Sequence, residues 1–212
     1  MVLDPHRALA SLLSSGPHPR LVWSNDSGER LELSGRVTAN WAVKIANLLL
    51  EEAEAEAGTR VLLDLPVHWR TAVWALGTWL TGAAVVLPAT DTAPGELPDG
   101  GVDVIVTTSP QEWVGKADLV VAVALPALAL SWPGDLPSSV LDGASDVAGY
   151  GDALGVVVGA QGSDLALSVG EVEVRYSGAG GLDGSAEVGA VAGTLLAMLA
   201  TWAEGEQVVL RG

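Results

Sequence analysis

The sequence of 212 residues contains no cysteine. Disulfide bonds, a thiolate nucleophile and zinc–thiolate sites are therefore excluded for these residues. The absence is compatible with a reducing compartment, and we expect a cytoplasmic protein. Phenylalanine is also absent, so eight tryptophans supply most of the aromatic mass. We expect them in the core or at an interface, because tryptophan buries a large apolar surface.

Basic residues are scarce. The chain has 10 Lys and Arg against 26 Asp and Glu, which gives a formal net charge of -16. An acidic chain repels phosphate backbones and anionic membrane surfaces, so nucleic acid and membranes are not expected partners. The apolar stretches 71–90 and 188–203 contain glycines and are predicted to be buried core elements rather than membrane spans. The early charges at the N-terminus are not typical of a signal peptide.

Several catalytic motifs are missing as well. The sequence contains no Walker loop, no Gly-x-Ser-x-Gly elbow and no His-Glu-x-x-His helix. The three histidines, His6, His18 and His68, are far apart, and no serine near them occupies a recognisable strained turn. The acidic run 51–56 places consecutive carboxylates on different sides of a helix. We therefore predict no catalytic triad and no metal site.

Residues 59–90 form the unit around which the chain is organised. Val61–Leu65 is a short apolar run that ends at Pro66, and Ala83–Leu87 is a second such run that ends at Pro88. Between them, apolar residues recur at spacings of three and four from about residue 69, and Gly82 is suited to a left-handed helix cap. The pattern predicts strand, helix and strand, with the two strands parallel and buried on both faces.

The remaining pattern extends this unit into one α/β domain over 1–212, with a three-layer, mostly parallel open sheet and helices on both faces. The segment 126–154 is rich in Pro, Gly and Asp and is predicted to be an irregular link with one helix over 138–148. The strands at 156–158, 165–169 and 171–175 are predicted to form a small meander or a second sheet. The other expected elements are helices at 4–15, 34–57, 110–115 and 186–203, a hairpin over 21–33, and strands at 102–107, 119–125 and 207–210.

Residues 58–91, GTRVLLDLPVHWRTAVWALGTWLTGAAVVLPATD, resemble the early part of the AMP-binding, adenylate-forming enzymes related to acyl-CoA synthetases. A hairpin and a long helix precede this stretch in the order that those enzymes use. The sequence looks most like a small actinobacterial family related to their N-terminal part. The resemblance implies the fold of that N-terminal subdomain.

The resemblance also implies a phosphate-binding loop between a strand and a helix. Tyr176 opens a glycine-rich segment at this place, and backbone N–H groups of such loops bind phosphates. The candidate ligand-binding residues are Ser177, Gly178, Gly180, Gly181 and Ser185. The segment departs from the family pattern, because it lacks the threonine pair and the Pro-Lys-Gly ending and carries Asp183. The alternative is an ordinary turn between a strand and a helix.

A second candidate site follows the strand that ends at Pro66. Open α/β sheets bind ligands outside the carboxyl ends of their strands, so a pocket there would have His68, Trp69 and Arg70 near its rim. The alternative is a helix start with Trp69 buried and Arg70 solvated.

These observations favour a non-catalytic, vestigial relative of adenylate-forming enzymes that binds a protein partner or a small ligand. The alternative is an enzyme or binding protein that retains weak binding of AMP, ATP or an acyl-adenylate at residues 177–185. A third hypothesis is a homodimer whose exposed tryptophans form the interface. No obligatory cofactor or metal is expected, because the magnesium, ribose and catalytic lysine motifs of the resembled enzymes are absent.

Overall fold

The computed structural model describes residues 2–89, 92–157, 159–178 and 190–212. These described residues contain a seven-stranded sheet with the strand order β7-β6-β5-β3-β4-β8-β9. All neighbouring pairs are parallel except the antiparallel hairpin β8–β9. The strands are β3 (Arg60–Asp64), β4 (Ala84–Leu87), β5 (Val104–Thr107), β6 (Leu119–Ala122), β7 (Val140–Asp142), β8 (Leu165–Val169) and β9 (Val172–Arg175).

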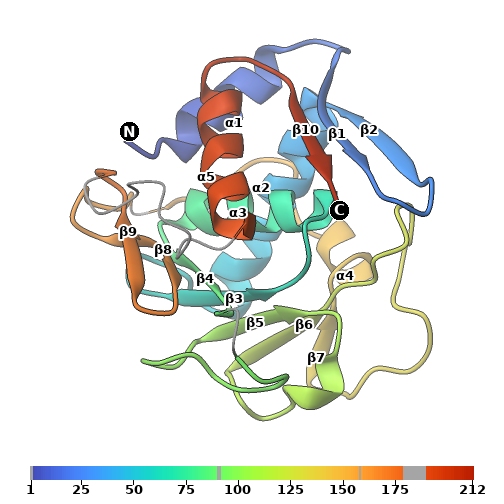
Figure 1. Ribbon diagram of the computed structural model, residues 1–212, viewed down its shortest axis with the longest axis vertical. Helices are drawn as coiled ribbons and strands as arrows, with labels where there is room; N and C mark the ends of the chain where they lie inside the picture. Colours follow the sequence, from blue (N-terminus) through green and yellow to red (C-terminus); the bar gives the residue numbers. More distant parts are fainter. Residues whose placement is uncertain (1, 90–91, 158, 179–189) are drawn as a thin grey trace.

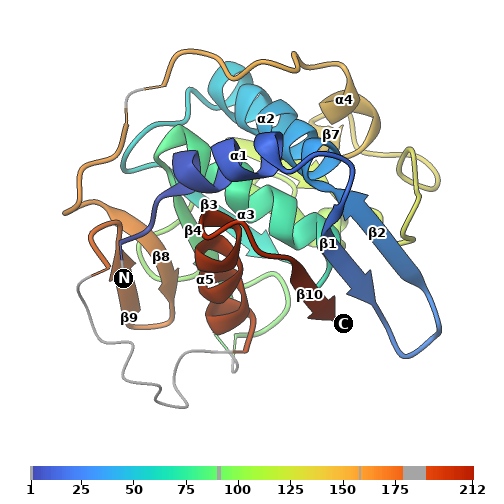
Figure 2. The same ribbon diagram turned by 90° about the horizontal axis from the view of Figure 1, so that it is seen from above.

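The central strands are apolar because both faces of the sheet are buried. Successive side chains point to opposite faces, so Val61 and Leu63 of β3 enter one core while Leu62 enters another. The first core lies under four helices, which Figures 1 and 2 show on the same side of the sheet: α1 (Pro5–Ser14), α2 (Gly35–Glu52), α3 (Trp69–Thr81) and α5 (Ala190–Ala203). The second, smaller core lies under the 3₁₀ helix η1 (Pro110–Glu112) and Trp113. Helices thus flank both faces of the sheet as predicted, with four α-helices on one face and a short 3₁₀ helix on the other.

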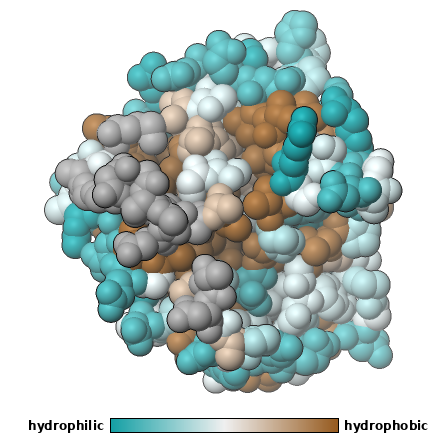
Figure 3. Space-filling view, viewed as in Figure 1, coloured by the Kyte–Doolittle hydropathy of each residue, from teal (hydrophilic) through white to brown (hydrophobic). Residues whose placement is uncertain are grey.

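A second sheet of three strands lies beside the helices (Figure 1). It joins the hairpin β1 (Pro19–Ser24) and β2 (Arg30–Ser34) to β10 (Val208–Arg211), which pairs parallel to β1. The indole Nε1 of Trp202 in α5 donates to the Arg20 carbonyl at 2.9 Å, which attaches this helix to the hairpin. Figure 3 shows apolar surface on this side of the molecule near β10, where Val209 is exposed.

Helix boundaries follow the capping residues. The Asp4 carboxylate accepts the Arg7 N–H at the start of α1, and the Ser34 hydroxyl accepts the Val37 N–H at the start of α2. Gly82 ends α3 with φ 89°, which confirms the predicted left-handed cap. The helix predicted over 34–57 is shorter than expected, because α2 ends at Glu52 and Glu54 has a positive φ of 47°.

The segment 126–154 contains more regular structure than we predicted. The single helix expected over 138–148 is wrong: residues 140–142 form β7 and residues 145–148 form the short helix α4 (Ser145–Ala148). Val140 pairs with Val120, so the segment supplies a fifth parallel strand to the sheet. A strand needs a partner, and no local pattern in so short a stretch identifies it.

The prediction for residues 156–175 needs a similar correction. Residues 156 and 157 form no strand, Val156 is 97% exposed, and residue 158 lies outside the described residues. The hairpin β8–β9 exists, but it does not form a separate sheet, because Leu167 pairs with Val85 of β4. Helix α5 is described from Ala190, so the predicted start at residue 186 lies outside the described residues.

No helix in the described ranges is both long enough and apolar enough to cross a bilayer. Among the same residues, no group of three or more His, Cys, Asp or Glu side chains is arranged to hold a metal ion.

Candidate ligand-binding site

His68 and Arg70 lie at the carboxyl end of the central strand β3, where the sequence placed them. The strand ends at Asp64, and the turn that follows leads into α3. His68 has extended backbone angles and is the N-cap of this helix, because its Nδ1 accepts the Arg70 N–H at 3.2 Å. The α3 N-terminus and its partial positive charge therefore lie beside the imidazole.

The imidazole of His68 is buried, with 3% of the residue exposed. Its ring contacts Trp23 edge to face, with 4.3 Å between the ring centroids. Burial and the charge of Arg70 lower the pKa of His68 to about 4, while Glu29 and the backbone of Leu125 act in the opposite direction. His68 is therefore neutral at pH 7. Since Nδ1 accepts a hydrogen bond, the proton is on Nε2.

Nε2 of His68 is buried and makes no hydrogen bond of good geometry among the described residues. The backbone carbonyl of Leu125 acts on the imidazole as a hydrogen-bond acceptor, which raises the pKa of His68 against the larger lowering by burial. The donor is therefore partly satisfied by the loop after β6 and is closed to the neighbouring cavity.

Arg70 is 2% exposed, which corrects the alternative in which its side chain was solvated. The guanidinium lies over two indoles, with Cζ 4.5 Å from the Trp69 centroid and 5.4 Å from the Trp41 centroid. Nη2 donates to the Ala129 carbonyl, and Nε has no partner in the described structure. Burial lowers the pKa of Arg70 to about 10, partly opposed by Asp142, so the group is charged at neutral pH. The aromatic faces replace the water that we expected around it.

A cavity of about 390 Å³ adjoins His68, and we call it the His68 pocket. It is bounded by four segments that are distant in sequence: the β1–β2 hairpin, the turn before α3, the loop after β6, and the residue that follows β10. Glu29 lies on its hairpin side, where its carboxylate accepts the Asn25 Nδ2–H at 2.9 Å and, at 3.4 Å, the Ala127 N–H. The lining residues are Trp23, Asn25, Glu29, Pro66, Val67, His68, Leu125, Pro126 and Gly212. Its size is within the range of small-ligand sites.

The other predicted site residues belong to a different region. Ser177 and Gly178 follow β9; the Ser177 N–H donates to the Gly162 carbonyl at 2.8 Å, and Gly178 has φ 70°. Gly180, Gly181 and Ser185, as well as Asp183, lie outside the described residues. The structure does not bring Ser177 into the same cavity as His68.

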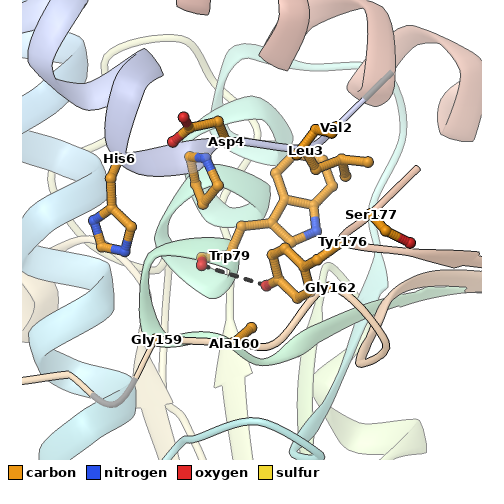
Figure 4. Close-up of a pocket in the computed structure, with 11 residues that line it drawn as sticks. Val2, Leu3, Asp4, His6, Trp79, Gly159, Ala160, Gly162, Tyr176 and Ser177 are labelled. Atoms are coloured by element: carbon orange, nitrogen blue, oxygen red, sulfur yellow. Dashed lines mark hydrogen bonds between the residues drawn. The ribbon is translucent and has the colours of Figure 1, made fainter. Parts of the chain in front are cut away.

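Ser177 lines a cavity of about 220 Å³ whose other walls come from the N-terminal segment, α3 and residues 159–162. Figure 4 shows Trp79 and Tyr176 on one side of it and His6 on another. The Tyr176 hydroxyl donates to carbonyls of residues 79 and 83, at 3.3 and 2.8 Å, so it is used to hold β9 against α3. This cavity is smaller than typical ligand sites.

Both lysines of the chain have structural partners. Lys44 donates to the carbonyls of Ala148 and Tyr150 and lies 2.9 Å from the Asp152 carboxylate. Lys116 donates to the Gly95 carbonyl at 2.6 Å and lies over the Trp113 ring. Neither side chain is available to neutralise a phosphate without breaking these contacts.

Sequence reasoning identified His68 but missed the residues opposite it. Glu29 belongs to a hairpin turn, and Leu125 lies just beyond β6. Glu29 reaches His68 because the second sheet packs beside α3, and Leu125 reaches it because β6 lies in the same sheet as β3. No local sequence signal reports either contact. Trp23 was expected only to be buried or at an interface.

Comparison with known proteins agrees with the resemblance found in the sequence. No family model matches the chain. A TIGR03089 family protein from Mycobacterium tuberculosis, an actinobacterium, is 35% identical over 164 residues, which cover 72% of this chain and 60% of that protein. The chain therefore spans 60% of the length of the curated relative that it matches.

Solved structures with the same fold are acyl-CoA synthetases and adenylation domains of nonribosomal peptide synthetases. A Brucella canis acyl-CoA synthetase superposes with a TM-score of 0.69 at 18% identity, covering 98% of this chain and 46% of that one. The acetoacetyl-CoA synthetase from Streptomyces lividans gives 0.70 at 14% identity, with 98% and 38% covered. At these identities the likeness shows the fold, which is that of the N-terminal domain of acyl-CoA synthetase-like enzymes.

Proposed function

We propose that this protein is a non-catalytic relative of the adenylate-forming enzymes and that it binds a small ligand in the His68 pocket. The observation that carries the proposal is a cavity of about 390 Å³ that is lined by the buried His68 and lies beyond the carboxyl end of β3. Its size is within the range of small-ligand sites. The position outside a strand carboxyl end is also the usual ligand position in open α/β sheets.

The composition of the glycine-rich segment supports the non-catalytic part of the proposal. Asp183 brings a negative charge to the segment that resembles a phosphate loop, where the family pattern has a lysine. Both lysines of the chain are tied to backbone carbonyls elsewhere. A triphosphate bound at this segment would therefore have no lysine to neutralise its charge. Such charge stabilisation is a major part of phosphoryl chemistry, so its absence disfavours catalysis.

Ligand-observed NMR with a small-fragment library tests the proposal, using two variants of the same chemical change. Val67→Phe places a larger side chain at the His68 pocket, whereas Val209→Phe adds the same bulk at an exposed position of β10 outside it. We expect fragments that bind the native protein and the Val209 variant but not the Val67 variant. Fragments that bind all three proteins equally, or no fragments at all, would contradict ligand binding in this pocket.

A second candidate function is weak binding of AMP, ATP or an acyl-adenylate at residues 177–185. It is favoured by the position of Ser177 and Gly178 two and three residues after the end of β9, with Gly178 at a positive φ. The discriminating variant replaces Gly180 and Gly181 by valine. Nucleotide binding that this variant loses, with unchanged circular dichroism, would support this candidate over the first one.

A further inference from the structure

The segment 149–155, which we call the strap, follows α4 and contains no helix or strand. It passes along α2 (Figure 2) and forms one wall of a groove of about 660 Å³, whose other walls are α1 and α2. Most of the strap is exposed, and its residues Tyr150 and Leu154 pack against the apolar core. Within the described part of the chain, no backbone–backbone hydrogen bond involves residues 151–155. Side chains must therefore hold the strap in place.

Asn47 of α2 makes three of these contacts. Its Nδ2 donates to the carbonyls of Gly151 and Ala153, at 2.9 and 2.8 Å. Its Oδ1 accepts the Gly155 N–H at 2.9 Å. The residue is 6% exposed, and both donors and the oxygen of its amide are used. One buried side chain thus satisfies backbone groups that a neighbouring strand would otherwise pair.

Lys44 holds the start of the strap. It lies three residues before Asn47, which places the two side chains on one side of α2. Its ammonium group donates to the carbonyls of Ala148 and Tyr150 and lies 2.9 Å from the Asp152 carboxylate. Two neighbouring side chains of one helix therefore attach the whole strap.

The other walls of the groove are fixed by close packing. A Cβ added to Gly35, at the start of α2, would overlap Ser15 and the Leu12 carbonyl at the end of α1. The two helices thus touch through their backbones and cannot separate without losing this contact. The strap has no comparable contact, so it is the wall that can move.

From these contacts we infer that the strap opens and closes the groove by local release from α2. The backbone groups that Asn47 pairs lie on an exposed segment, so water replaces the amide when the strap moves outward. Release uncovers the floor of the groove at Val43, which is 4% exposed and lies one helical turn before Asn47. The inference is independent of ligand binding in the His68 pocket.

Single-cysteine labelling tests the inference, because the chain has no cysteine of its own. Val43→Cys reports opening of the groove, whereas Val73→Cys, buried in α3 outside the groove, reports unfolding of the whole domain. Cysteine is a small apolar residue, so both changes are mild. We expect N-ethylmaleimide to label Val43→Cys at least tenfold faster than Val73→Cys, as followed by mass spectrometry. Adding Asn47→Leu should speed only the first reaction, at least tenfold.

Lys44→Met releases the strap in a second way, with Lys116→Met as its control. Both lysines donate to backbone carbonyls, but Lys116 binds Gly95, outside the strap. Lys44→Met alone should speed the labelling of Val43→Cys, at least threefold. Equal labelling of Val43→Cys and Val73→Cys, or equal acceleration of both by Asn47→Leu, would show that the groove opens only when the domain unfolds and would overturn the inference. Labelling of Val43→Cys that neither strap variant accelerates would overturn it as well.

Discussion

His68 has two roles that a single residue rarely combines. Its Nδ1 caps α3, which stabilises the helix start, while burial of its imidazole lowers the pKa, which makes the protonated form unfavourable in the folded state. Such a conflict is expected at functional positions, where local stability is reduced in favour of binding. The residue therefore gives a stability prediction.

The lowered pKa of His68 predicts a stability loss in mild acid. The pKa is about 4 in the folded state against 6.5 when unfolded, so the unfolded chain takes up the proton first as the pH falls. The free energy of unfolding should be unaffected by this group above pH 6.5 and fall by up to about 1.4 kcal/mol per pH unit toward pH 4. Urea unfolding of the native protein and His68→Asn, a non-titrating cap, measures the difference. Parallel pH profiles for the two proteins would contradict the prediction.

Asp64 is the last residue of β3 and is a half-buried charge next to the buried apolar residues of that strand. Its Oδ2 accepts from the Thr107 hydroxyl at 2.7 Å and from the Trp113 indole at 3.0 Å. Asp64→Ala should reduce the free energy of unfolding by about 2–3 kcal/mol, because two buried donors lose their acceptor. Asp64→Asn, which keeps an acceptor oxygen, should cost less. Chemical denaturation measures the free energy of unfolding of both variants. Equal decreases in the two variants would argue against the hydrogen bonds as the cause.

The sequence patterns predicted where a residue lies relative to the strands and helices better than they predicted what surrounds its side chain. His68 was correctly placed after β3, and the alternative of a solvated Arg70 was wrong, because Trp41 and Trp69 enclose the guanidinium. The first placement depends on neighbours in sequence, whereas Trp41 comes from another helix. Long-range contacts of this kind leave no local pattern in the chain.

At the scale of elements, the packing of α2 on α3 depends on a glycine. A Cβ at Gly77 would lie 2.5 Å from Ile45 Cγ2 and 3.0 Å from the Ala42 carbonyl oxygen. Gly193 is also helical, but a Cβ there would meet no atom within 4 Å. The two positions form a matched pair for the same substitution.

Gly77→Ala should destabilise the protein by about 1–2 kcal/mol, because the overlap with α2 outweighs the better helix propensity of alanine. Gly193→Ala should instead stabilise it by up to about 1 kcal/mol, since the propensity gain is unopposed. Thermal unfolding followed by circular dichroism measures both. A stabilised Gly77 variant would show that the helices separate at little cost.

The elements that were predicted best are those whose own residues carry the pattern that identifies them. Helix α3 has apolar periodicity and a glycine cap, and it begins and ends where the sequence indicated. Strand β7 was missed, since residues 140–142 are too few for a period and acquire strand geometry by pairing with β6. The hairpin β8–β9 was found, but its attachment to β4 was not, because register with a distant strand depends on the whole fold.

At the scale of the molecule, one apolar core extends from Leu3 to Leu210. The N-terminal segment is joined to the strand region by the Leu3 N–H, which donates to the Tyr176 carbonyl at 2.9 Å, and β10 pairs with β1. We therefore expect a single cooperative unfolding transition. Tryptophan fluorescence and far-ultraviolet circular dichroism should give coincident urea curves. Two separated transitions would contradict the single-domain prediction.

The structure does not support a homodimer interface made of exposed tryptophans, which the sequence suggested. Six of the eight tryptophans are buried and Trp41 and Trp132 are half-buried, so none is an exposed anchor. Self-association through another surface stays a prediction, which light scattering tests. The net charge of -16 opposes close approach of two copies at low salt.

The central claim is that the chain binds a small ligand without the nucleotide chemistry of the enzymes whose fold it shares. A thermal shift titration with ATP and Mg²⁺, AMP and coenzyme A tests this claim most directly. A ligand at 100 times its dissociation constant stabilises a protein by about 2.7 kcal/mol, which raises the Tm by several degrees. We predict no shift with any of the three ligands. A shift with a nucleotide that disappears when Gly180 and Gly181 become valine would contradict the account.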